Sequence, residues 1–311
     1  MFGDDKDAGI SSAQFSEGSG ERFDAGASAF PALSFEAVRA AIRAFPITSF
    51  LLLAFLYSWG CWFFLAASGF DYNQRIWKLI YVAGLSGPLM ASLAVSFAIG
   101  GMNEVRRLAG RVLIWKFSPV WYALALLLAP ALMLAAMGLY GLLFHKAIEL
   151  PTVTLGVVAV TFGYMILRGG PANEELGWRG FVLPRLLERH SPLRATAVLA
   201  PIWAVWHWPL WLLRGLPHRY WPFLVFFLIV APLTVLFTWL HLRTGGSVLA
   251  ATLFHGSVNT AIHFLPALPP RYPGLGPFGL WIAVTWAVAL LAIWFDWRRW
   301  LAVPGRVSAL R

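Results

Sequence analysis

The chain of 311 residues is poor in charge and almost free of cysteine. Only 12% of its residues are charged and only 14 are Asp or Glu, whereas 59% are hydrophobic and the mean hydropathy is +0.69. Charged residues make up about a quarter of an ordinary soluble domain. The composition therefore excludes that class and predicts a single integral membrane domain. The lone cysteine, Cys61, excludes an internal disulfide and a cysteine-based metal site.

Several signatures of other membrane proteins are also missing. The sequence has no Gly-x-Ser-x-Gly elbow, no aspartate pair within a hydrophobic stretch and no His-Glu-x-x-His, so serine-elbow and aspartyl intramembrane mechanisms lack their residues. It has no internal repeat of the kind that secondary transporters usually show. The N-terminus lacks the basic region and apolar core of a secretory signal peptide. The first hydrophobic helix is therefore expected to serve as the targeting signal.

Long hydrophobic stretches predict an all-α, polytopic membrane bundle of about eight transmembrane helices. Residues 1–43, rich in Gly, Ser, Ala and Asp, are expected to form a disordered polar tail. Residues 44–300 are expected to form the transmembrane domain, and 301–311 a short cytoplasmic tail. The predicted spans are 45–67, 79–100, 120–144, 152–170, 195–213, 220–242, 247–265 and 278–297.

The distribution of Lys and Arg predicts how the bundle is oriented. With both termini in the cytoplasm, 18 of the 24 basic residues fall in cytoplasmic segments, and the other six are Arg75, Lys78, Lys146, Arg214, Arg219 and Arg271. We therefore expect a multi-pass protein of the inner (plasma) membrane. Basic loops that face anionic membrane lipids account for the net charge of +10 without a nucleic-acid partner.

Two adjacent carboxylates, Glu174 and Glu175, are the only acidic residues placed beside the core of the bundle. An ionisable residue at membrane depth indicates a functional site by default. If the segment is helical, Glu175 and Arg179 share a face and can form a structural ion pair. Glu174 points about 100° away from that pair. It is therefore free to face a cavity and to act on a substrate.

Polar side chains also fall inside two later spans. His207 lies in the fifth, and His255 and Asn259 lie four residues apart in the seventh, so both can face a single oxygen atom. His263 lies one turn beyond Asn259 in the same predicted helix. Each residue also has a purely structural reading, as a hydrogen-bonded packing histidine or as an amide that bonds a neighbouring helix. Gly256 and Ser257 predict a close helix approach in either case.

Three motifs in order carry a resemblance to a known family. They are Glu-Glu-x-x-x-Arg (Glu174, Glu175, Arg179), aromatic-x-x-x-His (Trp203, His207) and His-x-x-x-Asn (His255, Asn259). Together they resemble the CPBP family of intramembrane proteases, which contains the type II CAAX prenyl endopeptidases and bacterial proteins linked to bacteriocin processing and self-immunity. The resemblance covers approximately residues 150–265. The family usually has Phe where this chain has Trp203, which puts the shape of the pocket in doubt more than the chemistry.

The resemblance implies a role for each matched residue. Glu174 and His207 would activate a water molecule, His255 and Asn259 would stabilise the oxyanion, and Glu175 and Arg179 would support the site. Peptide hydrolysis needs a base, oxyanion donors and a proton for the leaving amine, which these residue types can supply. We expect no metal cofactor. Zinc held by Glu174, His207 and His255 remains an alternative, because a His₂Glu set is known in catalytic zinc sites.

The sequence thus predicts an intramembrane endopeptidase, a hydrolase that cuts a membrane-associated peptide or protein tail near the cytoplasmic face of the membrane. A prenylated CAAX substrate is a narrower and weaker expectation. Two alternatives stay open: a non-catalytic scaffold or bacteriocin-immunity protein on the same fold, and a proton-coupled transporter with Glu174 as its relay. The filled catalytic positions favour the protease.

Overall fold

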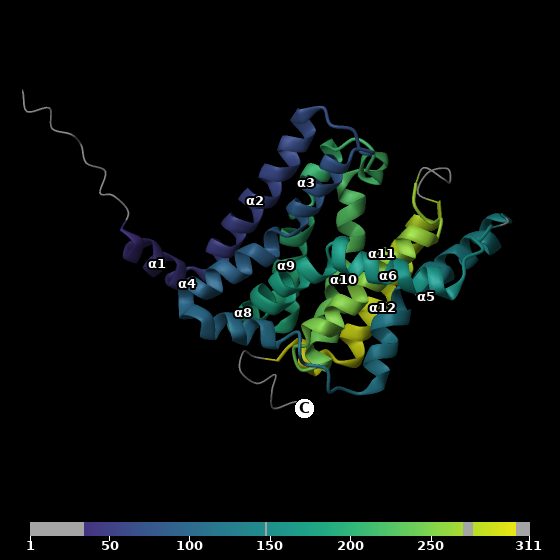
Figure 1. Cartoon of the computed structure of the whole chain (residues 1–311). Helices are drawn as coiled ribbons and strands as arrows, with labels where there is room; N and C mark the ends of the chain where they lie inside the picture. The colour runs from purple at the N-terminus through teal and green to yellow at the C-terminus, as the bar shows by residue number, and fades with distance from the viewer. Residues whose placement is uncertain (1–33, 147, 270–275, 303–311) are drawn as a thin grey trace, which may run out of the picture.

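A computed structural model describes residues 34–146, 148–269 and 276–302. In this part of the chain the regular secondary structure is helical, as expected (Figure 1). The elements are α1 (Phe35–Ala44), α2 (Pro46–Ser68), α3 (Arg75–Leu85), α4 (Gly87–Gly110), α5 (Pro119–Phe144), α6 (Leu155–Arg168), α7 (Pro171–Glu175), η1 (Leu176–Val182), α8 (Leu183–Leu187), α9 (Pro192–Trp206), η2 (Trp208–Leu212), η3 (Pro217–Tyr220), α10 (Phe223–Arg243), α11 (Val248–Phe264), α12 (Gly276–Phe295) and α13 (Trp297–Trp300).

Four of the described helices, α2, α5, α10 and α12, are long and apolar enough to cross a membrane alone. The number rises to six if each of two bent helix pairs counts as one span. The chain is thus a multi-pass membrane protein, but the predicted count of eight spans is not reached by this measure. Two of the eight predicted spans correspond to α9 and α11, which have only 15 and 17 residues.

The fifth predicted span, 195–213, ends earlier than expected. Helix α9 stops at Trp206, His207 forms its C-cap, and the chain continues as the short helix η2. Pro209 explains the early end, because proline has no N–H to donate and restricts the residue before it. As a result, His207 lies at a helix terminus rather than inside a span.

The fourth predicted span, 152–170, also continues differently. Helix α6 ends at Arg168, and the chain bends by 43° before it resumes at Pro171. Gly169 and Gly170 form the bend, and Gly170 has a φ of +105°, which favours glycine. The chain then continues through α7, the fully buried π-helical turn η1 and α8. The segment predicted to be helical around the Glu pair is therefore helical, but it belongs to the same broken span as α6.

The predicted polar tail falls mostly outside the described residues. Residues 1–33 and 303–311 are not described, whereas the last part of the predicted tail forms the amphipathic helix α1. Ser34 caps α1, and Arg39 and Arg43 donate hydrogen bonds to the carbonyls of Ala98 and Ile99 on α4. Ordered structure thus begins before residue 44.

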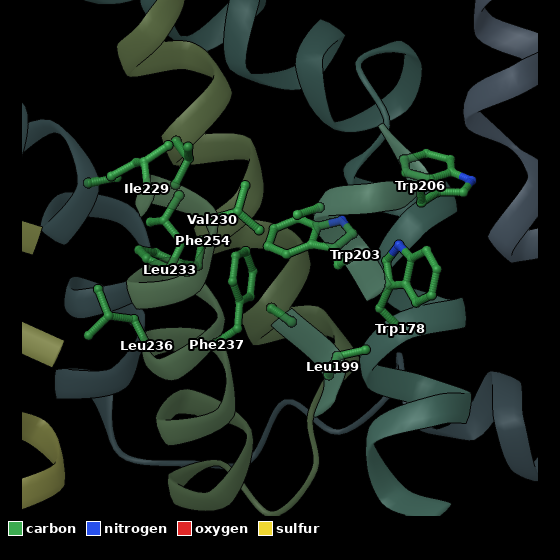
Figure 2. Packing of buried hydrophobic residues seen from close by; sticks show 14 of the residues in the cluster. Trp178, Leu199, Trp203, Trp206, Ile229, Val230, Leu233, Leu236, Phe237 and Phe254 are labelled. Atoms are coloured by element: carbon green, nitrogen blue, oxygen red, sulfur yellow. The ribbon is translucent and has the colours of Figure 1, made fainter. Parts of the chain in front are cut away.

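Aromatic side chains pack η1, α9, α10 and α11 together (Figure 2). The rings of Trp178 and Trp206 lie 5.8 Å apart, those of Trp203 and Phe237 5.5 Å, and those of Phe237 and Phe254 4.8 Å. Such edge-to-face contacts fix ring positions as well as burying area. These contacts therefore hold η1, α9, α10 and α11, which carry most of the motif residues or pack against them, in fixed positions relative to one another.

The bundle has two ends with different charge (Figure 1). Loops 69–74, 207–222 and 265–269 lie at what we call the upper end, together with the start of α3 and α10. Loops 111–118, 188–191 and 244–247, with α13, lie at the lower end, and α1 lies at the left, against α2 and α4. The described basic residues in these lower segments or next to them along the chain are Arg106, Arg107, Arg111, Lys116, Arg185, Arg189, Arg194, Arg243, Arg298 and Arg299; those in or next to the upper segments are Arg75, Lys78, Arg214 and Arg219.

Candidate active site

Glu174 lies in α7, immediately after the glycine bend. Its side chain is only 2% exposed, and Oε2 accepts a 2.9 Å hydrogen bond from Nε1 of Trp203 on α9. A Cβ on Gly170 would lie 2.5 Å from Oε1 of Glu174, so this carboxylate packs directly against the glycine. The indole and the bend together fix where the carboxylate stands.

Glu175 is fully buried and joins two other residues of the site. Its Oε1 accepts hydrogen bonds of 2.9 Å from Nη1 of Arg179 and 2.7 Å from Nδ1 of His255 on α11. The ion pair predicted from the i, i+4 spacing is therefore present. The bond to His255 was not predicted. Because the carboxylate accepts, Nδ1 of His255 carries the hydrogen and Nε2 is left for other partners.

The guanidinium of Arg179 contacts two aromatic rings in addition to forming its ion pair with Glu175. Its guanidinium carbon lies 4.1 Å from the ring centre of Trp203 and 3.9 Å from that of Phe237. Cation–π contacts of this kind stabilise a desolvated guanidinium. Trp203 therefore touches both halves of the site, because it donates to Glu174 and stacks on the arginine that pairs with Glu175. From the sequence, Trp203 was recognised as the aromatic residue of its motif, but its hydrogen bond to Glu174 was not predicted.

His207 is oriented by the backbone of its own helix. Its Nδ1 lies 2.8 Å from the carbonyl oxygen of Trp203. A carbonyl can only accept, so Nδ1 carries the hydrogen and Nε2 of the neutral ring is an acceptor. The rings of Trp203 and His207 are 5.8 Å apart, and those of Trp203 and His255 are 5.7 Å apart. The two histidines thus contact the same indole.

Asn259 lies one turn beyond His255 on α11. Its Nδ2 donates a 3.0 Å hydrogen bond to the carbonyl of Gly169 in the bend, which leaves its second N–H available. Gly256 on the same helix approaches Ile166 closely, and Ser257 donates to the carbonyl of Leu126. The close helix approach predicted from Gly256 and Ser257 is confirmed, and it brings α11 against both α5 and α6.

A single cavity of about 490 Å³ connects these residues. Glu174, His207, His255 and Asn259 all line it, and His263 does so further along α11. Most of the remaining wall is aliphatic or aromatic. The volume lies in the range of about 300–1,000 Å³ that is common for ligand pockets. The motif residues that line this cavity therefore share one space, and a peptide segment can enter it.

His218 of η3 also faces this cavity, which its position in a loop did not indicate. Burial lowers the pKa of His218 to about 4, because the surrounding aromatic rings replace water around the imidazole. The ring is therefore neutral at physiological pH.

The proposed zinc ligands are not arranged as a metal site in the described part of the chain. Within residues 34–146, 148–269 and 276–302, no three His, Cys, Asp or Glu side chains form a group that could hold a metal ion. Nδ1 of His207 and Nδ1 of His255 are both engaged in hydrogen bonds, so a metal would have to bind through Nε2 of each. The side chains of Glu174, His207 and His255 would have to move closer together to bind zinc.

The structure changes the basis on which the site was assigned to the cytoplasmic face. That assignment counted Arg168 and Arg179 as cytoplasmic loop residues. In the structure both lie in the broken span, Arg168 on the wall of the cavity and Arg179 fully buried. The cavity also reaches Tyr72 and Pro217 in the loops of the upper end, whereas α13, the element next to the C-terminus, lies at the lower end (Figure 1). The cavity therefore extends from the motif residues toward the loops of the upper end.

Similarity to known proteins agrees with the motifs. Residues 156–261 match a family model described as Rce1-like, type II CAAX prenyl endopeptidase Rce1-like. The match lies within the 150–265 core expected from sequence. The chain is also 28% identical over 238 residues to CAAX prenyl protease 2 of Methanococcus maripaludis, which covers 68% of this chain and 81% of that protein. The predicted resemblance is confirmed, and it supports an intramembrane endopeptidase activity, that is, a hydrolase.

Proposed function

We propose that this chain, similar to the Rce1-like type II CAAX prenyl endopeptidases across its motif-bearing core, hydrolyses a peptide bond in a membrane-associated peptide or protein tail. The observation that carries the proposal is the shared cavity, which Glu174, His207, His255 and Asn259 all line. The apolar remainder of its wall suits the hydrophobic side chains or lipid modification of such a substrate. A prenyl group is one such modification.

In the proposed reaction, Glu174 and His207 position and deprotonate a water molecule. Glu174 is a buried carboxylate held by Trp203, and Nε2 of His207 is an acceptor because Nδ1 donates to a carbonyl. The water oxygen attacks the peptide carbonyl carbon while its proton passes to this pair. The same proton then goes to the leaving amine as the C–N bond breaks. The products are a carboxylic acid and an amine. The acid then gives its proton to the amine, which leaves a carboxylate and an ammonium group, and no metal takes part in these steps.

The oxyanion is proposed to be stabilised by Asn259 and His255. Asn259 has a second N–H beyond the one bonded to Gly169. Nε2 of His255 donates only when the ring is protonated, since Nδ1–H already donates to Glu175. Glu175, which accepts the Nδ1–H of His255, is itself paired with the buried guanidinium of Arg179. Charge balance of this kind lowers the cost of burying ionised groups.

The membrane face at which cleavage occurs follows from charge. Basic residues concentrate at the lower end of the bundle, and loops rich in Lys and Arg face the cytoplasm. We therefore retain cytoplasmic termini, assign the protein to the plasma membrane and propose that the cavity opens toward the opposite face. The alternative is cleavage near the cytoplasmic face, as expected from the sequence.

The first test compares wild type with Glu174→Gln, both purified and reconstituted in liposomes. Each receives a panel of membrane-anchored peptides, one of them a prenylated CAAX peptide, and products are identified by mass spectrometry. We expect cleavage by wild type and a loss of about 10²-fold or more in Glu174→Gln, since the variant lacks the general base. A parallel run with a zinc chelator should leave the rate unchanged. Equal cleavage by both proteins would contradict the proposed role of Glu174.

A folded wild type that cuts no peptide would instead favour a binding scaffold. Uptake driven by a pH gradient, abolished in Glu174→Gln without any cleavage, would favour the proton-coupled transporter.

A further inference from the structure

Helix α1 has an apolar side that the described part of the protein leaves largely uncovered. Phe35 and Val38, three residues apart, are 79% and 41% exposed, and Phe45 at the C-cap of α1 is 66% exposed. Arg39 and Arg43 follow Phe35 at intervals of four residues, so they lie beside this apolar side. An exposed apolar face bordered by basic residues is typical of helices that lie in the plane of a membrane surface.

The neighbouring helices place α1 at a boundary of the bilayer. Helix α1 ends at Ala44, and α2, which is long and apolar enough to cross a membrane, begins two residues later. Because α2 ends next to loop 69–74 of the upper end, its beginning lies at the opposite membrane face. Helix α4 packs against α1 (Figure 1), and its sequence is largely apolar up to Gly101 and largely polar over residues 103–107. Helix α1 therefore lies where α2 enters the bilayer and α4 leaves it.

The two arginines of α1 bind the backbone of α4 just before a kink. The backbone of α4 departs from helical geometry at the two glycines 100–101. Nε of Arg39 donates a 2.8 Å hydrogen bond to the carbonyl of Ala98. Nε of Arg43 donates one of 3.1 Å to the next carbonyl, that of Ile99. In the part of the chain that the structure describes, both guanidiniums bind through Nε alone and neither pairs with a carboxylate. Their Nη groups are therefore available for another acceptor.

We propose that Arg39 and Arg43 bind the phosphate of an anionic phospholipid, whose acyl chains cover the apolar side of α1. Adjacent carbonyls on α4 hold the two guanidiniums at one place, and a guanidinium binds phosphate through paired hydrogen bonds. Lipid phosphates lie at the level of a helix in the membrane surface. Two cations without a carboxylate partner favour a lipid of net negative charge over a zwitterionic one. The site lies outside the cavity that Glu174 lines, and it does not depend on the proposed function.

The test titrates full-length protein in detergent with phosphatidylglycerol or phosphatidylcholine and counts bound lipids by native mass spectrometry. We expect wild type to bind phosphatidylglycerol about tenfold or more tightly than phosphatidylcholine, because each arginine attracts the anionic lipid. Arg39→Gln/Arg43→Gln should bind the two lipids equally, and each single variant, which keeps one arginine on α4, should lose part of the preference.

Arg189→Gln/Arg298→Gln is the matched control for this titration. It removes the same charge from two exposed residues elsewhere and should keep the preference for phosphatidylglycerol. Thermal unfolding without added lipid checks that every variant is folded. An equal loss of preference in the control and in Arg39→Gln/Arg43→Gln would show that overall charge attracts the lipid, and the proposed site would be wrong.

Two further measurements identify the occupant. Inorganic phosphate at the concentration of the lipid should leave phosphatidylglycerol bound, and displacement would assign the arginines to a free anion and overturn the proposal. The second measurement uses a Cys61→Ala background in phosphatidylcholine–phosphatidylglycerol vesicles. A fluorescent label on Phe35→Cys should be quenched by brominated acyl chains, and one on Ala40→Cys, about 140° around the helix, by aqueous iodide. Iodide quenching of both labels would mean that no acyl chain covers α1, and the proposal would fail.

Discussion

Trp203 is the residue at which this chain departs from the usual Phe of its motif, and the hydrogen bond to Glu174 gives that departure a physical meaning. A phenyl ring can stack on Arg179 but cannot donate to a carboxylate. In this chain the indole does both. Trp203 is therefore a positioning residue for Glu174 as well as a packing residue.

Trp203→Phe should lower kcat by about tenfold or more, because a hydrogen bond to a charged acceptor is lost while the aromatic stacking is kept. The measurement is kcat on a cleaved peptide together with thermal stability in detergent. Trp206→Phe is the matched control. It removes a buried indole from the same helix whose N–H has no acceptor in the described part of the chain. Equal kcat values for the two variants would show that Trp203 acts through packing alone.

Glu175 and Arg179 illustrate how far sequence reasoning reaches at this scale. Their pairing follows from local helix geometry and was predicted. The bond from His255 to Glu175 joins residues 80 positions apart, and helix spacing carries no information about it. The same holds for Trp203 and Glu174, which are 29 positions apart. The motif resemblance identified these residues as members of one site, but their hydrogen-bond partners could be identified only from the structure.

We predict that Arg179→Ala and Glu175→Gln each reduce folded yield and thermal stability. Removing one member of a buried ion pair costs about 3–5 kcal/mol, because the other charge is left unpaired. Glu175→Gln should in addition lower the kcat of the folded fraction, since a neutral amide is a weaker acceptor than a carboxylate for the Nδ1–H of His255. Thermal unfolding and kcat per folded molecule separate the two effects. Wild-type stability with no activity in both variants would assign the pair to the chemistry instead.

At the scale of elements, the glycine bend between α6 and α7 determines where Glu174 stands. We predict that Gly170→Ala lowers activity at least tenfold, because a φ of +105° is strained for alanine and its Cβ would lie 2.5 Å from the carboxylate. Gly163→Ala, within α6, is the control, since a Cβ there meets no atom within 4 Å. Activity and thermal stability are measured for both. Comparable activity would mean that the bend tolerates a side chain.

Element boundaries were the least predictable part of the fold. Hydropathy located a helix in each predicted span, because apolar length is set by the thickness of the membrane. It did not reveal that α6 continues through a bend into α7 and α8, since a hydropathy window averages over a break. The run Gly169-Gly170-Pro171 and the proline at position 209 are local signals for these breaks. If these two signals are taken as helix breaks, the predicted fourth and fifth spans become shorter.

At the scale of the whole molecule, the separation of charge from the cavity predicts the orientation. A reporter fused after Arg311 should be cytoplasmic, because the lower end carries most of the basic residues. The lone cysteine permits a second measurement. In a Cys61→Ala background, a membrane-impermeant thiol reagent should label Arg219→Cys in intact cells and Arg189→Cys only after lysis. The reverse labelling would place the cavity loops in the cytoplasm and overturn the predicted orientation.

The position of the cavity at the upper end also bears on when cleavage happens. Helix α13, next to the C-terminus, lies at the basic end, and the loops around the cavity lie at the other (Figure 1). With the basic end in the cytoplasm, a tail made inside the cell has to cross the bilayer before its scissile bond can enter the cavity. In the proposed orientation hydrolysis would follow export, and the cut end of the substrate would record that translocation is complete.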